Sequence, residues 1–104
     1  MGFDVEDVLG RMADAINDEV VGSVGDIKDY AKKIMKNEED SLRELALARV
    51  SGEIDDEILE MEMEREKKVV EAELLTMQIM TKALAQRAVN AAIDVFHTAV
   101  KAAI

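Results

Sequence analysis

The chain contains no cysteine, no proline and no tryptophan among its 104 residues. Without cysteine it cannot form a disulfide, a thiolate metal site or a thiol nucleophile. Turns rely on proline and glycine, and the chain has only five glycines, which is too few for an all-β fold with its many turns. These absences point to an all-α protein.

Aromatic residues are also scarce, at 3% of the chain, whereas hydrophobic residues make up 49%. The hydrophobic residues are mainly alanine, valine, isoleucine, leucine and methionine, which pack helix against helix with small or flexible side chains. This content is too high for a disordered acidic chain. We therefore expect a single all-α domain spanning the 104 residues.

Positive charge is limited, since 13 lysine and arginine residues face 23 aspartate and glutamate residues, for a net charge of −10. Nucleic acids and anionic lipid surfaces are therefore not expected partners, because both need a basic face. The longest uncharged run, residues 74–81, is far shorter than the roughly 20 residues that span a bilayer. No apolar segment typical of a signal peptide stands at the N-terminus. We expect a cytoplasmic protein.

Between residues 4 and 50, apolar side chains recur every three or four positions, which predicts a helix. Asp4 is a candidate N-cap for its first turn. Gly22 and Gly25 weaken the pattern, because each glycine costs a helix roughly 1 kcal/mol relative to alanine. The apolar stripe nevertheless keeps its phase across them. The sequence thus predicts that the first helix is kinked or broken at residues 22–25, and it favours a kink or short irregularity over a reversal of direction.

The clearest turn falls at residues 51–55. Gly52 suits the left-handed residue that ends a helix, and Asp55 can cap the next one. Residues 53–104 contain no glycine and no proline, so we expect one uninterrupted helix over about residues 55–103. Because short connections join antiparallel neighbours, the two long helices should form an antiparallel helical hairpin.

Charge supports this hairpin and suggests its register. With the turn centred near Gly52, the acidic run 38–40 lies opposite Arg65, Lys67 and Lys68. Each exposed ion pair contributes only about 0–1 kcal/mol, so such pairs would fix the register more than the stability. The sequence predicts ion pairs across the hairpin at these positions.

From residue 69 onward the second helix is apolar nearly all round, apart from one polar strip that we expect to face water: Gln86, Arg87, Asn90, Asp94, His97, Thr98 and Lys101. One partner helix covers a stripe of roughly 100°, so a lone hairpin would leave an apolar face in water. We therefore expect a homo-oligomer, most simply a dimer that forms a four-helix or larger bundle. Its predicted interface is Leu75, Ile79, Met80, Leu84, Val89, Ile93, Phe96 and Val100.

Asp94 and His97 stand one helical turn apart, at the spacing that di-metal carboxylate bundles use for Glu-x-x-His. With Glu6, Asp7 and Asp14 near the same level, they could belong to a metal site. Because a single Asp-x-x-His arises readily by chance and such bundles normally supply glutamate, our preferred interpretation is that the pair belongs to the solvated polar strip. A row of acids on the second helix is likewise interpreted as a solvated face: Glu57, Glu60, Glu64 and Glu71.

No pairing of a nucleophile with a base emerges from the sequence, and no glycine-rich phosphate loop is present. We therefore predict a non-enzymatic, self-associating helical scaffold, adaptor or assembly subunit without a cofactor. Its partners would be further copies of the chain and possibly another protein. The alternative is a ferritin-like metal-binding bundle that uses Asp94 and His97.

Overall fold

The computed structural model describes residues 3–104, and this part of the chain contains helices and no strands. The five helices are α1 (Val5–Val24), α2 (Lys28–Asn37), α3 (Glu39–Ser51), α4 (Asp56–Leu75) and α5 (Lys82–Ala103). The predicted all-α class is confirmed. Over the same residues, no helix combines the length and apolar character that crossing a bilayer requires.

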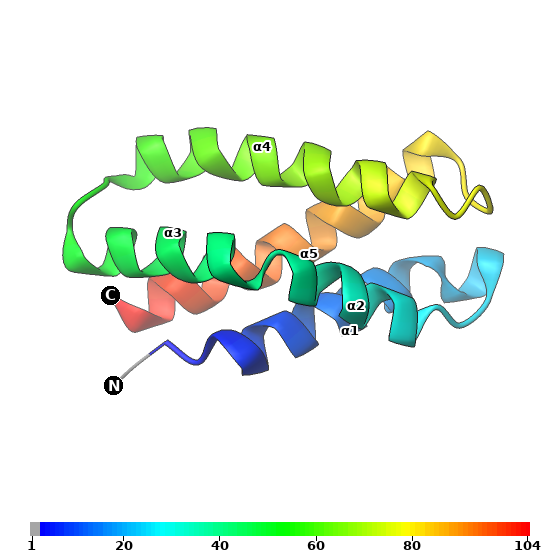
Figure 1. Cartoon of the computed structure of the whole chain (residues 1–104), viewed down its shortest axis with the longest axis horizontal. Helices are drawn as coiled ribbons and strands as arrows, with labels where there is room; N and C mark the ends of the chain where they lie inside the picture. The colour runs from blue at the N-terminus through cyan, green and yellow to red at the C-terminus, as the bar shows by residue number, and fades with distance from the viewer. Residues whose placement is uncertain (1–2) are drawn as a thin grey trace.

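The helices form four antiparallel arms, so that the start of α1 and the end of α5 lie at the same end of the molecule (Figure 1). The helices α2 and α3 follow one another with only Glu38 between them, and together they make one arm, called here the α2–α3 arm. The molecule measures 40 × 24 × 19 Å. A single chain thus builds the four-armed bundle that we expected from two copies.

The first helix is broken near residues 22–25, and the preference for a kink over a reversal was wrong, because the chain reverses direction there and α2 packs back along α1. Gly25 takes a φ of +92°, which favours glycine. The side-chain oxygen of Asn17 accepts a hydrogen bond from the Ile27 amide at 2.8 Å and ties the loop to α1. The apolar stripe kept its phase because both helices bury their stripes in the same core, so phase alone could not distinguish a kink from a reversal.

The single helix predicted over residues 55–103 is also interrupted, at residues 76–81. Gln78 has a φ of +58°, a left-handed conformation that costs a non-glycine residue about 1–2 kcal/mol. Thr81 then caps α5 by accepting a hydrogen bond from the Leu84 amide at 3.1 Å. The reversal lays α5 along α1, and each large apolar side chain so buried contributes about 1.5–3 kcal/mol. Burial outweighs the local strain.

The predicted turn at residues 51–55 is confirmed. Gly52 is left-handed with a φ of +87°, and the Asp55 carboxylate accepts a hydrogen bond from the Ile58 amide at 2.9 Å. The predicted register holds as well, since Arg49 reaches Asp56 at 2.7 Å across the turn. The local capping residues and the turn position therefore suffice to align the α2–α3 arm with α4.

The ion pairs predicted across that hairpin do not form. Arg65 pairs with Glu62 at 3.2 Å and Lys67 with Glu64 at 2.9 Å, both within α4. Residues three apart on a helix are already neighbours, so these pairs need no particular position of the opposite arm. The register is set by capping and apolar packing instead.

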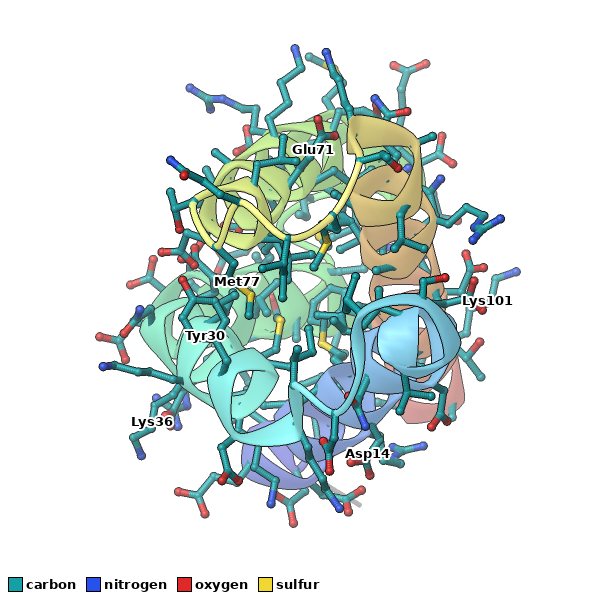
Figure 2. The ribbon with its side chains drawn as sticks, turned by 90° about the vertical axis from the view of Figure 1, so that its right-hand side faces the viewer. Asp14, Tyr30, Lys36, Glu71, Met77 and Lys101 are labelled. Carbon is teal, nitrogen blue, oxygen red and sulfur yellow. The ribbon has the colours of Figure 1, made fainter. Side chains whose placement is uncertain are left out.

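The core lies between the four arms, where carbon and sulfur atoms fill the interior while charged side chains point outward (Figure 2). Its most extensive helix contact is that of α1 with α5. Phe96 is fully buried, and the ring of Phe3 meets its ring edge-on with centroids 5.9 Å apart. The apolar face of α5 is thus covered by the chain itself.

The residues predicted as an oligomer interface lie mostly in this core. Five of them are at most 7% exposed, namely Leu84, Val89, Ile93, Phe96 and Val100. Leu75 and Met80 are half-buried against the core, and Ile79 is 48% exposed in the loop before α5. The interface was assigned to a second copy because the reversal at residues 76–81 was missed.

Phe96→Ala should lower the free energy of unfolding by about 3–5 kcal/mol, because it removes a fully buried ring and leaves a cavity. Urea unfolding followed by circular dichroism measures this loss. Ile79→Ala is the matched control and should change the stability by no more than about 0.5 kcal/mol, since that side chain is half exposed in a loop. Similar losses in the two variants would contradict the assignment of the core.

Candidate functional site

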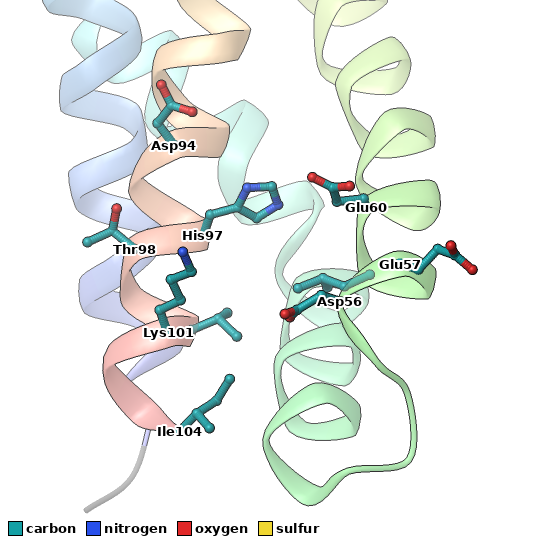
Figure 3. Close-up of a pocket in the computed structure, with 10 residues that line it drawn as sticks. Asp56, Glu57, Glu60, Asp94, His97, Thr98, Lys101 and Ile104 are labelled. Atoms are coloured by element: carbon teal, nitrogen blue, oxygen red, sulfur yellow. The ribbon is translucent and has the colours of Figure 1, made fainter.

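A groove lies between the start of α4 and the end of α5, called here the α4–α5 groove (Figure 3). It encloses about 710 Å³, a volume typical of small-molecule sites. Polar side chains from both helices and a few apolar ones line it: Asp56, Glu57, Leu59, Glu60, Asp94, His97, Thr98, Val100, Lys101 and Ile104. The groove therefore combines an acidic rim with an apolar floor.

The candidate metal residues Asp94 and His97 both line this groove. The imidazole of His97 points toward Glu60 on α4, whereas the Asp94 carboxylate does not (Figure 3). Nε2 of His97 is buried and has no hydrogen-bond partner within residues 3–104. In that part of the chain, no three acidic or histidine side chains converge closely enough to hold a metal ion. The ferritin-like alternative thus finds no ligand set here.

The acids of α1 that were considered as further ligands lie outside the groove and are exposed. Asp7 pairs with Arg11 at 3.1 Å, and Asp14 lies 3.6 Å from Lys28. Glu6 lines a separate shallow hollow between α1 and the α2–α3 arm. The structure therefore does not bring these acids together with Asp94 and His97.

The polar strip of α5 faces water, as predicted, apart from one residue. Exposed members of the strip are Gln86, Arg87, Asn90, Asp94, Thr98 and Lys101, whereas His97 is half-buried. Arg87 lies 3.9 Å from Glu19 of α1. The predicted acidic row on α4 is mostly exposed too, with Glu71 half-buried.

Asp56 is the acid of the groove that the structure holds most firmly. The Arg49 guanidinium donates a hydrogen bond to it at 2.7 Å and lowers the pKa of that carboxyl, and the charges of Arg49, Lys101 and His97 lower it further. In return, the same hydrogen bond raises the pKa of Arg49. An arginine of α3 therefore neutralises one acid of the groove.

A second polar site, missed by the sequence reasoning, lies between α4 and the α2–α3 arm. Glu66 is only 8% exposed, and Ser41 donates a hydrogen bond to its Oε1. Oε2 of Glu66 and Oε2 of Glu73 are buried, and neither has a partner among the described residues. Burial, a hydrogen bond to Glu66, and the charges of Glu66 and Glu73 raise the pKa of Glu38 to about 7.

The sequence did contain a signal for this site. Glu66 stands at three- and four-residue spacing from Met63 and Val70, which belong to the buried face of α4. A glutamate at such a position is enclosed by the core of the bundle unless the helix is rotated. Glu66 was not among the residues singled out from the sequence.

The outward side of α4 carries three large apolar side chains in contact with water. Ile58 is 42% exposed, Met61 64% and Val69 45%. They lie opposite the buried face of the same helix, which includes Leu59 and Met63. This side of α4 is called here the outer face.

No known protein family, curated protein or solved structure matches the chain. Its function therefore rests on its own residues and their geometry.

Arg49→Gln should raise the pKa of Asp56 toward its ordinary value, because the variant loses the charged donor that stabilises the carboxylate. A carbon-13 NMR titration of the side-chain carboxyls reports the change. Arg43→Gln is the control, since Arg43 pairs with Glu39 at 2.6 Å and does not contact Asp56. An Asp56 titration that is unchanged by Arg49→Gln would overturn the assignment.

Proposed function

We propose that the chain is a non-enzymatic assembly subunit that self-associates through the outer face of α4. The observation that carries this proposal is the exposure of Ile58, Met61 and Val69 on one side of one helix. Neighbouring apolar side chains on a surface that is otherwise charged mark a contact site more often than isolated ones do. The interface predicted on α5 is thereby moved to α4.

The arrangement of residues along α4 favours a second copy as the occupant. If two outer faces meet antiparallel, with the two-fold axis near Arg65, Met61 of one copy lies beside Val69 of the other. Such two-fold contacts use the same patch on both copies. The contact would shield both pairs of apolar side chains from water.

Charge favours the same direction. The acids Glu57 and Glu64 precede Arg65 on α4, whereas Lys68 follows it, and all three of these flanking residues are exposed. An antiparallel contact sets Lys68 of one copy near the acids of the other. Each exposed pair contributes only about 0–1 kcal/mol, so the charges would select direction while the apolar side chains supply affinity. A parallel contact would set like charges side by side.

The α4–α5 groove gives less support to an enzyme. Thr98 is the hydroxyl on its lining, and no hydrogen bond among the described residues connects this hydroxyl to His97. Nucleophilic catalysis by a hydroxyl needs an adjacent base within hydrogen-bond reach. Self-association through α4 accounts better for the features of this surface.

Met61→Glu should shift the chain from dimer to monomer, because it replaces an apolar side chain of the contact with a charged one. Sedimentation equilibrium over a range of protein concentrations measures the shift, with at least a tenfold weaker association expected in the variant. Val21→Glu is the matched control: Val21 is 44% exposed on α1, away from the outer face, and its substitution should leave association unchanged.

A wild-type chain that stays monomeric at concentrations up to the millimolar range would overturn the proposal. So would equal weakening of association by the substitutions at positions 61 and 21. Circular dichroism of both variants verifies that any monomer is folded.

A further inference from the structure

We propose that Glu38, Glu66 and Glu73 form a proton-binding site that fastens α4 to the α2–α3 arm. A proton bound to this site adds a hydrogen bond between the two arms. Release of the proton leaves unpaired negative charges between the arms and loosens the packing of α4 on the α2–α3 arm. The device is separate from the outer face of α4, and its test does not depend on self-association.

The three carboxylates meet where two arms touch. Glu38 stands between α2 and α3, while Glu66 and Glu73 lie on the side of α4 that faces this arm. Within residues 3–104, none of the three takes part in a salt bridge. Acids close to them in the sequence do form ion pairs: Glu39 with Lys36 and Arg43, Glu62 with Arg65, and Glu64 with Lys67. A buried carboxylate without a cation is costly in its charged form.

Hydrogen bonding requires a proton in this site. Carboxylates only accept hydrogen bonds, so two of them can bond to each other only if one is protonated. Ser41 supplies one donor to Glu66, but Oε2 of Glu66 finds none. A proton shared by Glu38 and Glu66 provides the donor that is lacking. The Ser41 hydrogen bond joins the two arms whether or not the proton is bound, and the shared proton adds a second bridge that is present only while the site is protonated.

The charged groups around the site do not compensate for the loss of the proton. From α4, both Glu66 and Glu73 act on Glu38 as like charges. On the α2–α3 arm, the bases that flank Glu38 most closely in the sequence are Lys36 and Arg43, and both pair with Glu39. Nζ of Lys36 lies 3.9 Å from Oε1 of Glu39, and Nη2 of Arg43 lies 2.6 Å from Oε2.

The remaining elements add no cation to the site. From α1, Glu6 lies in a hollow with Lys32, Lys36 and Glu39, and the lysine and arginine side chains of α5 are exposed to water. On α2, the neutral Tyr30 hydroxyl contacts Thr76 at 3.1 Å and the Glu73 carbonyl at 3.4 Å.

The site titrates near neutrality. Burial first, then the hydrogen bond to Glu66 and the charges of Glu66 and Glu73, raise the pKa of Glu38 to about 7. In the unfolded chain the same group titrates near its ordinary value of 4.5.

The sign of the pH dependence follows from these values. Between about 4.5 and about 7 the folded chain holds a proton that the unfolded chain has released. The stability that this proton contributes is therefore fully present below about pH 4.5 and is lost as the pH rises through about 7. Ordinary exposed carboxylates are already charged over most of this range and add little to the slope.

Stability measured against pH tests the site. Urea unfolding of the wild type from pH 5 to pH 8.5 should show a midpoint that falls with pH. Glu38→Gln should remove most of this slope, because the amide stays neutral and still donates to Glu66 at every pH. Glu44→Gln is the matched control, since Glu44 is an exposed acid on α3 whose removal should leave the slope unchanged.

His97 is the one histidine of the chain. Because histidine side chains in general change charge between about pH 5 and pH 8, His97→Gln is measured in parallel. The slope that persists in His97→Gln and vanishes in Glu38→Gln belongs to the carboxylate site. A slope that vanishes in His97→Gln and persists in Glu38→Gln would overturn the proposal.

A carbon-13 NMR titration of glutamate carboxyls in the wild type keeps the proposal testable even if a variant fails to fold. One glutamate should titrate with a midpoint near 7, and amide hydrogen exchange in α4 should speed up across the same midpoint beyond the intrinsic pH effect. The amides of α1 and α5 should not follow it. If every glutamate carboxyl titrates below pH 6, the site does not exist.

Discussion

The antiparallel contact between α1 and α5 is the constraint on which the rest of the bundle depends. It buries Phe96 completely and is the most extensive helix contact in the molecule. To form it, the chain must reverse between α4 and α5, even though Gln78 then takes a left-handed conformation. The α2–α3 arm and α4 close the other side of the same core, so their positions follow from that contact.

The helix α4 depends on its neighbours in a different way. It packs on α5 and the α2–α3 arm through fewer contacts than α1 makes with α5, and its buried face includes Glu66. A fully apolar face would hold the helix at any pH. The carboxylate makes the attachment of α4 conditional on how its charge is satisfied, whereas α1 and α5 are joined mainly by apolar side chains, with one exposed ion pair between Arg87 and Glu19.

The elements that could be predicted from the sequence are those whose cause is local. Asp55 and Gly52 mark the turn before α4 because capping and left-handed geometry depend on the residue itself. The break at residues 76–81 has no glycine or proline and follows from burial of α5 against α1, which is distant in sequence. The polar strip of α5 was placed correctly in water because the spacing of its residues is a local feature. The apolar face of α5 was assigned to a second copy because the break that brings it to α1 was not predicted. His97 turns partly inward because α4 lies beside it, which the strip alone does not indicate.

Self-association and proton binding are proposed for opposite sides of α4, and each can be tested without the other. Met61 and Glu66 lie on opposite sides of one helix, so a change that loosens α4 from the α2–α3 arm also alters how rigidly the outer face is presented. A contact between two copies loses affinity when one of its surfaces must first be ordered. Self-association through α4 would then be stronger at acidic than at alkaline pH. The Glu38→Gln chain, which keeps the arm fastened at every pH, would associate with an affinity independent of pH.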